Sequence, residues 1–274
     1  MLVDTHCHSI SSSDGANTVA ELAAQAMRLG VDVLAVTDHC DAMATMPFPE
    51  FYGPHMSKTF YDEPVARNRF FETKEALRGQ PIRLLYGIEL GMPHLGPSDC
   101  AGLLARQQFD MVIGSVHTFM VDRDVDLVDF DEIHPNEAIH HYLWDLRETA
   151  RTGLVDTMAH IDYPLRYLPD RPGYAGSYKP FEEEVRLTLR TMVERGVALE
   201  LNGKSRKGDR YLLEPCVIRW YLEAGGEYMT YGSDAHRADQ LLRNYNDAVE
   251  YLKSCGVRHL AYFDRRRPVV YSID

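Results

Sequence analysis

Alternation of β-strand and α-helix patterns along the chain is the feature that most restricts its fold. Seven apolar runs with strand character each precede a stretch with helical features, and two further short β runs follow near residues 259–263 and 269–271. Such alternation is typical of parallel strands joined by helices. We therefore expect an α/β protein, a distorted seven-strand (β/α)7 TIM-like barrel, formed by residues 1–274 as a single domain.

Residues that commonly bind metal ions stand at the C-terminal ends of the expected strands. His6 and His8 follow the first strand, and because side chains alternate along a strand, both can point to the same side. The same placement recurs at later strand ends, in His39, Glu89, His117, His160, Asp234 and His236. The C-terminal ends of barrel strands share one rim, so the sequence predicts a metal site on that rim.

Composition narrows the choice of partners and location. With 29 basic and 41 acidic residues the net charge is −12, which disfavours nucleic acid because that partner needs a basic surface. A small phosphorylated substrate remains compatible, since bound metal ions can dominate the local field. No apolar run approaches the roughly 20 residues of a membrane span, and the five cysteines lack CxxC spacing, so we expect a cytoplasmic protein without membrane contact.

Six short motifs stand in a characteristic order along the chain. They are Asp4-Thr5-His6-Cys7-His8, Thr37-Asp38-His39, Gly87-Ile88-Glu89, Gly114-Ser115-Val116-His117, Ala159-His160-Ile161-Asp162 and Gly232-Ser233-Asp234-Ala235-His236. This order resembles that of the PHP (polymerase and histidinol phosphatase) family over nearly the whole chain. Within the family, the segments around His117, Leu199-Glu200-Leu201-Asn202 and Gly232–Arg237 resemble the monofunctional histidinol-phosphate phosphatases.

The resemblance implies a site with three divalent transition-metal ions, which would be zinc, manganese or iron. The implied ligands are His6, His8, Glu89 and Asp234 for the first ion, Glu89, His117 and His160 for the second, and Asp14, His39 and His236 for the third. Glu89 would thus bridge two ions and, with them, hold a bridging hydroxide as the nucleophile. Some family members have a histidine where this chain has Asp14. The carboxylate of Asp14 is still a ligand, but it is harder than an imidazole nitrogen, so the third site suits metals that prefer oxygen. The general acid is left unassigned.

Two arginines are expected to bind the phosphate group, because the planar guanidinium matches phosphate oxygens. Arg166 stands where these phosphatases have a phosphate-binding arginine. A second cation is expected just after Asn202, where the chain has Lys204, Arg206, Lys207 and Arg210. The segment that begins at Asn202 is one residue shorter in this chain than in the family pattern. We favour Arg206 over Lys207 and expect the other cations to be solvated.

The expected function is metal-dependent hydrolysis of a phosphomonoester, most specifically of L-histidinol phosphate to L-histidinol and phosphate in histidine biosynthesis. The alternatives are a PHP phosphatase that acts on phosphotyrosine in a protein or on a nucleotide phosphate, and a metal-binding module without catalysis. The complete ligand set argues against the module. Three long connections, at 41–64, 118–134 and 161–179, leave from ligand-bearing strand ends and are expected to form lids over the site. The oligomeric state is left open.

Overall fold

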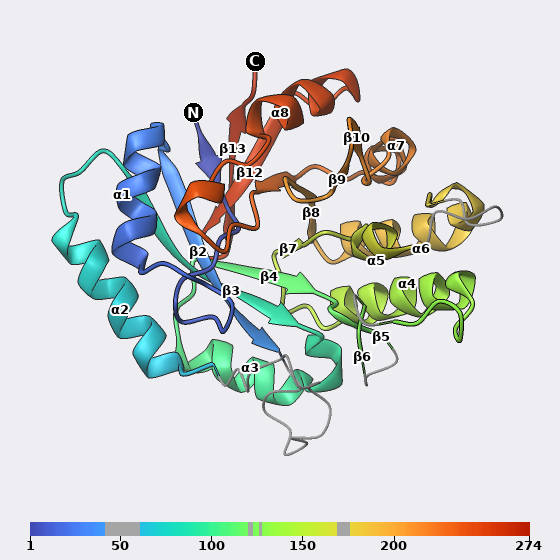
Figure 1. The fold of residues 1–274 in the computed structure, drawn as a ribbon, viewed down its shortest axis with the longest axis horizontal. Helices are drawn as coiled ribbons and strands as arrows, with labels where there is room; N and C mark the ends of the chain where they lie inside the picture. The colour runs from blue at the N-terminus through green and yellow to red at the C-terminus, as the bar shows by residue number, and fades with distance from the viewer. Residues whose placement is uncertain (42–60, 120–122, 126–127, 169–175) are drawn as a thin grey trace.

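Seven parallel strands form a nearly closed barrel with helices around it (Figure 1). The structure is a computed structural model that describes residues 1–41, 61–119, 123–125, 128–168 and 176–274. The barrel strands, in their spatial order, are β1 (Val3–Asp4), β2 (Val33–Asp41), β3 (Arg83–Gly91), β4 (Met111–Ser115), β7 (Thr157–Met158), β8 (Ala198–Asn202) and β11 (Met229–Gly232). The predicted seven-strand barrel is therefore confirmed.

Helices connect these strands and cover the barrel. They are α1 (Val19–Leu29), α2 (Glu63–Ala76), α3 (Pro97–Arg106), α4 (Pro135–Arg151), α5 (Tyr163–Tyr167), α6 (Glu182–Glu194), α7 (Pro215–Glu223) and α8 (Tyr245–Ser254). Their buried faces pack on the strands, whose side chains are almost all buried. Among the described residues, the structure contains no helix with the length and apolar character that a membrane crossing requires.

Local sequence signals explain where the first of these helices begins and ends. The Thr18 side chain accepts a hydrogen bond from the Glu21 backbone, and the Glu21 side chain accepts one from the Thr18 backbone. This reciprocal pair is a capping box, which satisfies backbone donors that a helix start leaves unpaired. Gly30 ends the helix in the left-handed conformation, with φ of 75°. Thr18, Glu21 and Gly30 are thus local signals in the sequence for the start and the end of this helix.

The barrel closes between its first and last strands. The Thr5 backbone donates to the Tyr231 carbonyl at 3.1 Å, and the His8 backbone donates to the Ala235 carbonyl at 2.8 Å. These bonds continue the pairing beyond the two short strands. They bring the N-terminal histidines of the chain beside the segment that follows β11, so ligands from opposite ends of the sequence meet.

A C-terminal hairpin lies at the N-terminal end of the barrel. It consists of β12 (His259–Asp264) and β13 (Arg267–Ser272), which pair antiparallel. At its turn, the Arg266 backbone donates to the Asp110 carbonyl at 2.8 Å, and the Arg266 guanidinium lies 2.5 Å from Asp156 Oδ2. The hairpin therefore covers the end of the barrel opposite to the predicted metal rim, and both chain termini lie near it (Figure 1).

Several smaller elements were not predicted from the sequence. Helix α5 and the two-stranded sheets β5 (Thr118–Phe119) with β6 (Arg123–Asp124) and β9 (Arg206–Lys207) with β10 (Arg210–Tyr211) lie in regions expected to be loops. Strand β2 continues to Asp41, so His39 lies within it rather than after it. Most of the first expected lid, and the central parts of the other two, lie outside the described residues.

Candidate metal centre

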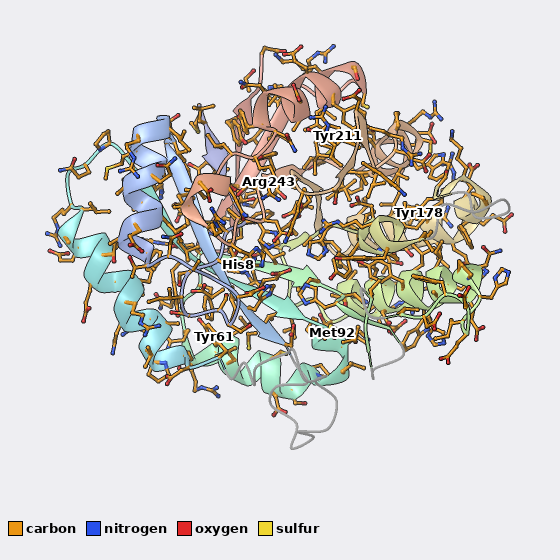
Figure 2. All side chains as sticks on the ribbon, viewed as in Figure 1. His8, Tyr61, Met92, Tyr178, Tyr211 and Arg243 are labelled. Carbon is orange, nitrogen blue, oxygen red and sulfur yellow. The ribbon has the colours of Figure 1, made fainter. Side chains whose placement is uncertain are left out.

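The structure brings all the predicted metal ligands together at the C-terminal ends of the barrel strands. His6 and His8 follow β1, His39 lies on β2 and Glu89 on β3. Paired strands fix their relative positions: His39 and Glu89 are direct neighbours in the register of β2 and β3. His8 is fully buried near the centre of the molecule (Figure 2). The convergence follows from the parallel topology, which places every such strand end on one rim.

Glu89 lies at the centre of this cluster, fully buried. Both of its carboxylate oxygens face imidazole nitrogens. The contacts of Oε2 are with His39 Nδ1 at 2.9 Å, His6 Nε2 at 3.1 Å and His8 Nε2 at 3.5 Å. The contacts of Oε1 are with His117 Nε2 and His160 Nε2, each at 3.2 Å. One carboxylate thus contacts five histidines from four segments of the chain, which is the position expected of a bridging ligand.

The remaining ligands surround this core on the side of β11. Asp234 Oδ1 lies 3.5 Å from both His8 Nε2 and His236 Nδ1. Asp14 Oδ2 lies 2.8 Å from His236 Nε2 and 3.6 Å from His39 Nε2. The structure therefore gathers the residues of each of the three predicted ligand sets. The contacts also link the sets, because the two ring nitrogens of His39 face Glu89 on one side and Asp14 on the other.

The ligand atoms also form compact groups of the kind that bind cations. Three groups have all their ligand atoms within 4.8 Å of one another: His6 with His8 and Asp234, His8 with His39 and His236, and His39 with Glu89 and His117. His8 Nε2 is buried and has no hydrogen-bond partner among the described residues. A buried, unpaired imidazole nitrogen beside two carboxylates fits a metal ligand.

Two central residues, Glu89 and His8, have the ionisation states that metal ligands need. Burial opposes ionisation of Glu89, but His6, His39 and His117 outweigh it and hold the pKa of Glu89 well below its usual range. Burial, together with His39 and His236, keeps the pKa of His8 well below its usual value. A neutral imidazole next to an ionised carboxylate offers a lone pair and a negative charge, the donor set that zinc and similar ions use.

Two carboxylates that were not predicted from the sequence orient the predicted ligands. Asp41 Oδ1 lies 3.2 Å from His117 Nδ1, and Glu200 Oε2 lies 2.8 Å from His6 Nδ1. Glu200 also accepts a hydrogen bond from the His160 backbone at 3.2 Å. Carboxylates in this position fix the tautomer and the orientation of a ligating ring. Despite burial, Glu89 and Asp41 raise the pKa of His117 to about 10.

One available sequence signal could have identified Glu200. It lies between leucines in a predicted strand, at a position where burial makes an unpaired carboxylate costly. In the structure Glu200 is fully buried. A charged residue within a buried strand of this kind requires polar partners inside the barrel, and here those partners are the predicted metal ligands His6 and His160. Asp41 had no comparable signal, because β2 was expected to end before it.

A cavity of about 150 Å³ opens over the metal centre. Besides ligands of all three sets it is lined by Arg166, Lys204, Tyr163 and Tyr167. Arg166, on α5, donates to Ser205 Oγ at 2.7 Å and stacks over the Tyr163 ring, with its Cζ 5.1 Å from the ring centroid. Its Nε is buried without a hydrogen-bond partner among the described residues. The structure thus places Arg166, as predicted from the sequence, in the lining of the candidate site, where its side chain is held in place but is not fully paired.

The second predicted phosphate ligand, Arg206, does not line this cavity. It lies on β9, where its guanidinium is 2.6 Å from Asp247 Oδ2 on α8 and packs over the Tyr211 ring. Lys207, the alternative, does not line the cavity either and is exposed. Lys204, which we expected to be solvated, is exposed, but its ammonium also lies 3.6 Å from Asp234 Oδ2 and it lines the cavity. The β9–β10 hairpin causes the difference, because it directs the residues after Ser205 away from the rim.

Comparisons with known proteins agree with this arrangement. A family model described as PHP domain matches residues 4–204. A protein of Clostridium acetobutylicum named "Probable histidinol-phosphatase" is 26% identical over 97% of this chain and 98% of its own length. A protein of Edwardsiella ictaluri named a probable phosphatase is 27% identical over 98% of this chain and 96% of its own length.

A solved structure has the same fold. It is the crystal structure of histidinol phosphate phosphatase from Lactococcus lactis complexed with zinc, L-histidinol and phosphate. Its TM-score to this structure is 0.82, with 23% sequence identity, and the alignment covers 98% of each chain. The shared architecture therefore extends over the barrel and the C-terminal hairpin alike.

Proposed function

The chain belongs to the PHP domain family, and from this premise we propose that it is a metal-dependent phosphatase that hydrolyses L-histidinol phosphate to L-histidinol and phosphate. The observation that carries the proposal is the buried Glu89 carboxylate surrounded by five histidines, with Arg166 in the lining of the same cavity. Residues that can bind metal ions and an arginine that can bind phosphate lie on one rim, and this combination fits a phosphomonoester substrate. The relative from Clostridium acetobutylicum and the zinc, L-histidinol and phosphate in the lactococcal structure support this choice of substrate.

We further propose that the centre binds three divalent ions, with zinc, manganese or iron as candidates. The ligand sets would be His6, His8, Glu89 and Asp234, then Glu89, His117 and His160, then Asp14, His39 and His236. When bound, such ions lower the pKa of water to give a nucleophile and stabilise charge on phosphoryl oxygens. Residues 1–274 would form one phosphatase domain, because β11 lies beyond the matched family region and precedes Asp234 and His236.

The protein's own side chains would position the substrate. Arg166 presents a planar fork that matches two phosphate oxygens, and Ser205 and Tyr163 hold this fork in place. Lys204 would supply the second positive charge, since its ammonium lies next to Asp234 at the cavity. Asp41 and Glu200 keep the ligating rings of His117 and His6 in one orientation. These contacts fix the phosphate relative to the metal centre before the reaction begins.

A phosphatase with another phosphomonoester substrate is the second candidate. The relative from Edwardsiella ictaluri, similar over almost the whole chain, is named only a probable phosphatase. Both candidates use the same metal centre and the same Arg166. They differ in what must be recognised beyond the phosphate, which is an imidazole and an ammonium group in one case, and a phenol or nucleoside in the other.

A panel of phosphomonoesters distinguishes the two candidates. We expect kcat/KM for L-histidinol phosphate to exceed the values for p-nitrophenyl phosphate, phosphotyrosine peptide and nucleoside monophosphates by at least about a hundredfold, the order of discrimination that specific polar contacts provide. The Glu89→Gln variant, purified in parallel, controls for a contaminating phosphatase. Equal efficiency on all substrates would reject histidinol phosphate as the specific substrate, and a preference for phosphotyrosine or a nucleotide would favour the second candidate.

A further inference from the structure

A cavity of about 840 Å³ lies at the end of the barrel opposite to the metal centre. Asp110, one of its lining residues, directly precedes β4, whereas the metal-centre residue His117 follows β4. Two arginines at the turn of the β12–β13 hairpin line the same cavity. The space is therefore separate from the candidate active site and is built from α2, the C-terminal end of α3 with the segment that leads to β4, and this hairpin.

The charge of this cavity is opposite to that of the chain. Five cationic side chains line it, against a single carboxylate, although the net charge of the protein is −12. The cationic residues are Arg67, Lys74, Arg106, Arg265 and Arg266. Scattered surface charge on an acidic protein would not produce such a concentration, and clusters of one sign raise the local concentration of the opposite ion.

Three of these cations have no carboxylate partner among the described residues. Lys74 lies 3.8 Å from Asp110, and Arg266 is paired with Asp156 outside the cavity. Arg67, Arg106 and Arg265 form no ion pair within the described part of the chain. The Asp110 carboxylate is further occupied by the Tyr86 and Arg265 backbones, at 2.9 and 3.4 Å. Three guanidinium groups thus remain available to an anion.

The fold holds some of these cations in place. Arg67, Phe71 and Lys74 are spaced i, i+4 and i+7, so they share one face of α2. The Arg67 guanidinium lies over the Phe71 ring, 5.1 Å from its centroid, and Lys74 Nζ lies 5.5 Å from the Phe70 centroid. Such cation–π contacts restrict long side chains that would otherwise be mobile. The cations therefore lose less entropy when a ligand binds.

The hairpin turn places arginines where glycine is usual. Asp264 pairs with Arg267, so Arg265 and Arg266 alone form the loop. Their φ angles are 51° and 63°. A two-residue turn with both φ angles positive normally uses Asn-Gly or Gly-Gly, because other side chains are strained there. Strained residues tend to occur at binding sites, and here both strained side chains line the basic cavity.

From these observations we propose that the basic cavity binds a small organic anion that carries a diphosphate group. One guanidinium group can donate to two phosphate oxygens at once. The three guanidinium groups without a carboxylate partner provide more positive charge than a single phosphate needs. The volume lies within the range of small-molecule sites, so the ligand is larger than an inorganic ion. This site adds to the proposed activity and does not depend on it.

Calorimetric titration of the metal-loaded protein with magnesium imidodiphosphate tests the proposal. This probe carries the diphosphate geometry but resists hydrolysis, and metal analysis after the titration verifies that the centre keeps its ions. We expect saturable binding that Arg67→Gln with Arg265→Gln weakens by at least about tenfold, since each change removes charge-assisted hydrogen bonds. The matched control, Arg28→Gln with Arg195→Gln, removes the same charge elsewhere and should leave the affinity unchanged.

The active site is the competing location for this probe, and Arg166→Met separates the two. We expect Arg166→Met to keep the binding, and hydrogen exchange to show protection in residues 63–77, 104–110 and 264–267. A magnesium complex of adenosine 5′-(β,γ-imido)triphosphate that binds tighter than imidodiphosphate would identify a nucleotide as the ligand, and equal affinities would leave the diphosphate group as the determinant. No saturable binding, or binding lost in Arg166→Met and kept in the Arg67 and Arg265 double variant, would overturn the proposal.

Discussion

Replacement of Glu89 by glutamine is expected to lower kcat/KM for L-histidinol phosphate by about a thousandfold, the largest effect of any conservative change in this protein. Glu89 contacts five histidines of the centre, and its pKa is held well below the usual range, so it is a fully charged carboxylate. Glutamine keeps the shape but removes the charge that two ions would share. The loss of a bridging ligand would weaken both the binding of the metal ions and their stabilisation of charge on the phosphoryl oxygens.

Two comparisons make this result specific to the centre. Glu194→Gln changes an exposed glutamate at the end of α6 and should leave activity unaltered. Asp14→Ala removes a ligand at the edge of the cluster, where half of the side chain is exposed. We expect its activity to recover in part when metal is added, because the other ligands of that set remain. Turnover of Glu89→Gln at the wild-type rate would show that the bridging role is wrong.

Replacement of Arg166 by methionine is expected to lower kcat/KM by about ten- to hundredfold while the metal content stays unchanged. This range corresponds to the loss of a charge-assisted hydrogen bond, worth roughly 1.5 to 3 kcal/mol. Methionine preserves much of the volume of the side chain and its packing against Tyr163. Steady-state kinetics and metal analysis on the same preparation measure both quantities.

Arg206→Met provides the matched control for the phosphate contact. Arg206 is ion-paired with Asp247 outside the cavity, on a side chain that is partly exposed. Surface pairs of this kind contribute little to stability, so the variant should fold and retain activity within about twofold. Lys204→Met should instead resemble Arg166→Met. A large loss in Arg206→Met with normal activity in Lys204→Met would contradict the assignment and support the choice made from the sequence.

The contrast between Arg206 and Lys204 shows where prediction from the sequence ends. Positions on strands are determined by period-two alternation and by the parallel topology, which is why the sequence alone predicts His6, His8 and Glu89 at one rim. Positions after Asn202 depend on how many residues form a turn. The β9–β10 hairpin begins at Arg206, and no local pattern distinguishes this hairpin from an open loop.

The supporting carboxylates illustrate a second limit. Asp41 contacts His117, although the two residues are 76 positions apart in the chain. Such a pair depends on the length of β2 and on the packing of two strand ends, neither of which the apolar pattern determines. Helix α5 escaped prediction for a related reason, since a single turn such as Tyr163–Tyr167 shows no helical periodicity. The barrel and the convergence of the predicted ligands could therefore be predicted, and burial within a strand could have indicated Glu200, whereas nothing in the sequence indicated Asp41.

Metal content of the protein purified without chelators is the measurement that tests the central claim most directly. The claim is that the residues on one rim of this barrel bind metal ions and that the phosphatase activity of the protein depends on these ions. Plasma mass spectrometry should find close to three divalent transition-metal ions per chain, and activity toward L-histidinol phosphate should fall with their removal and return with their replacement. A reproducible content of zero or one ion in fully active protein would contradict the account.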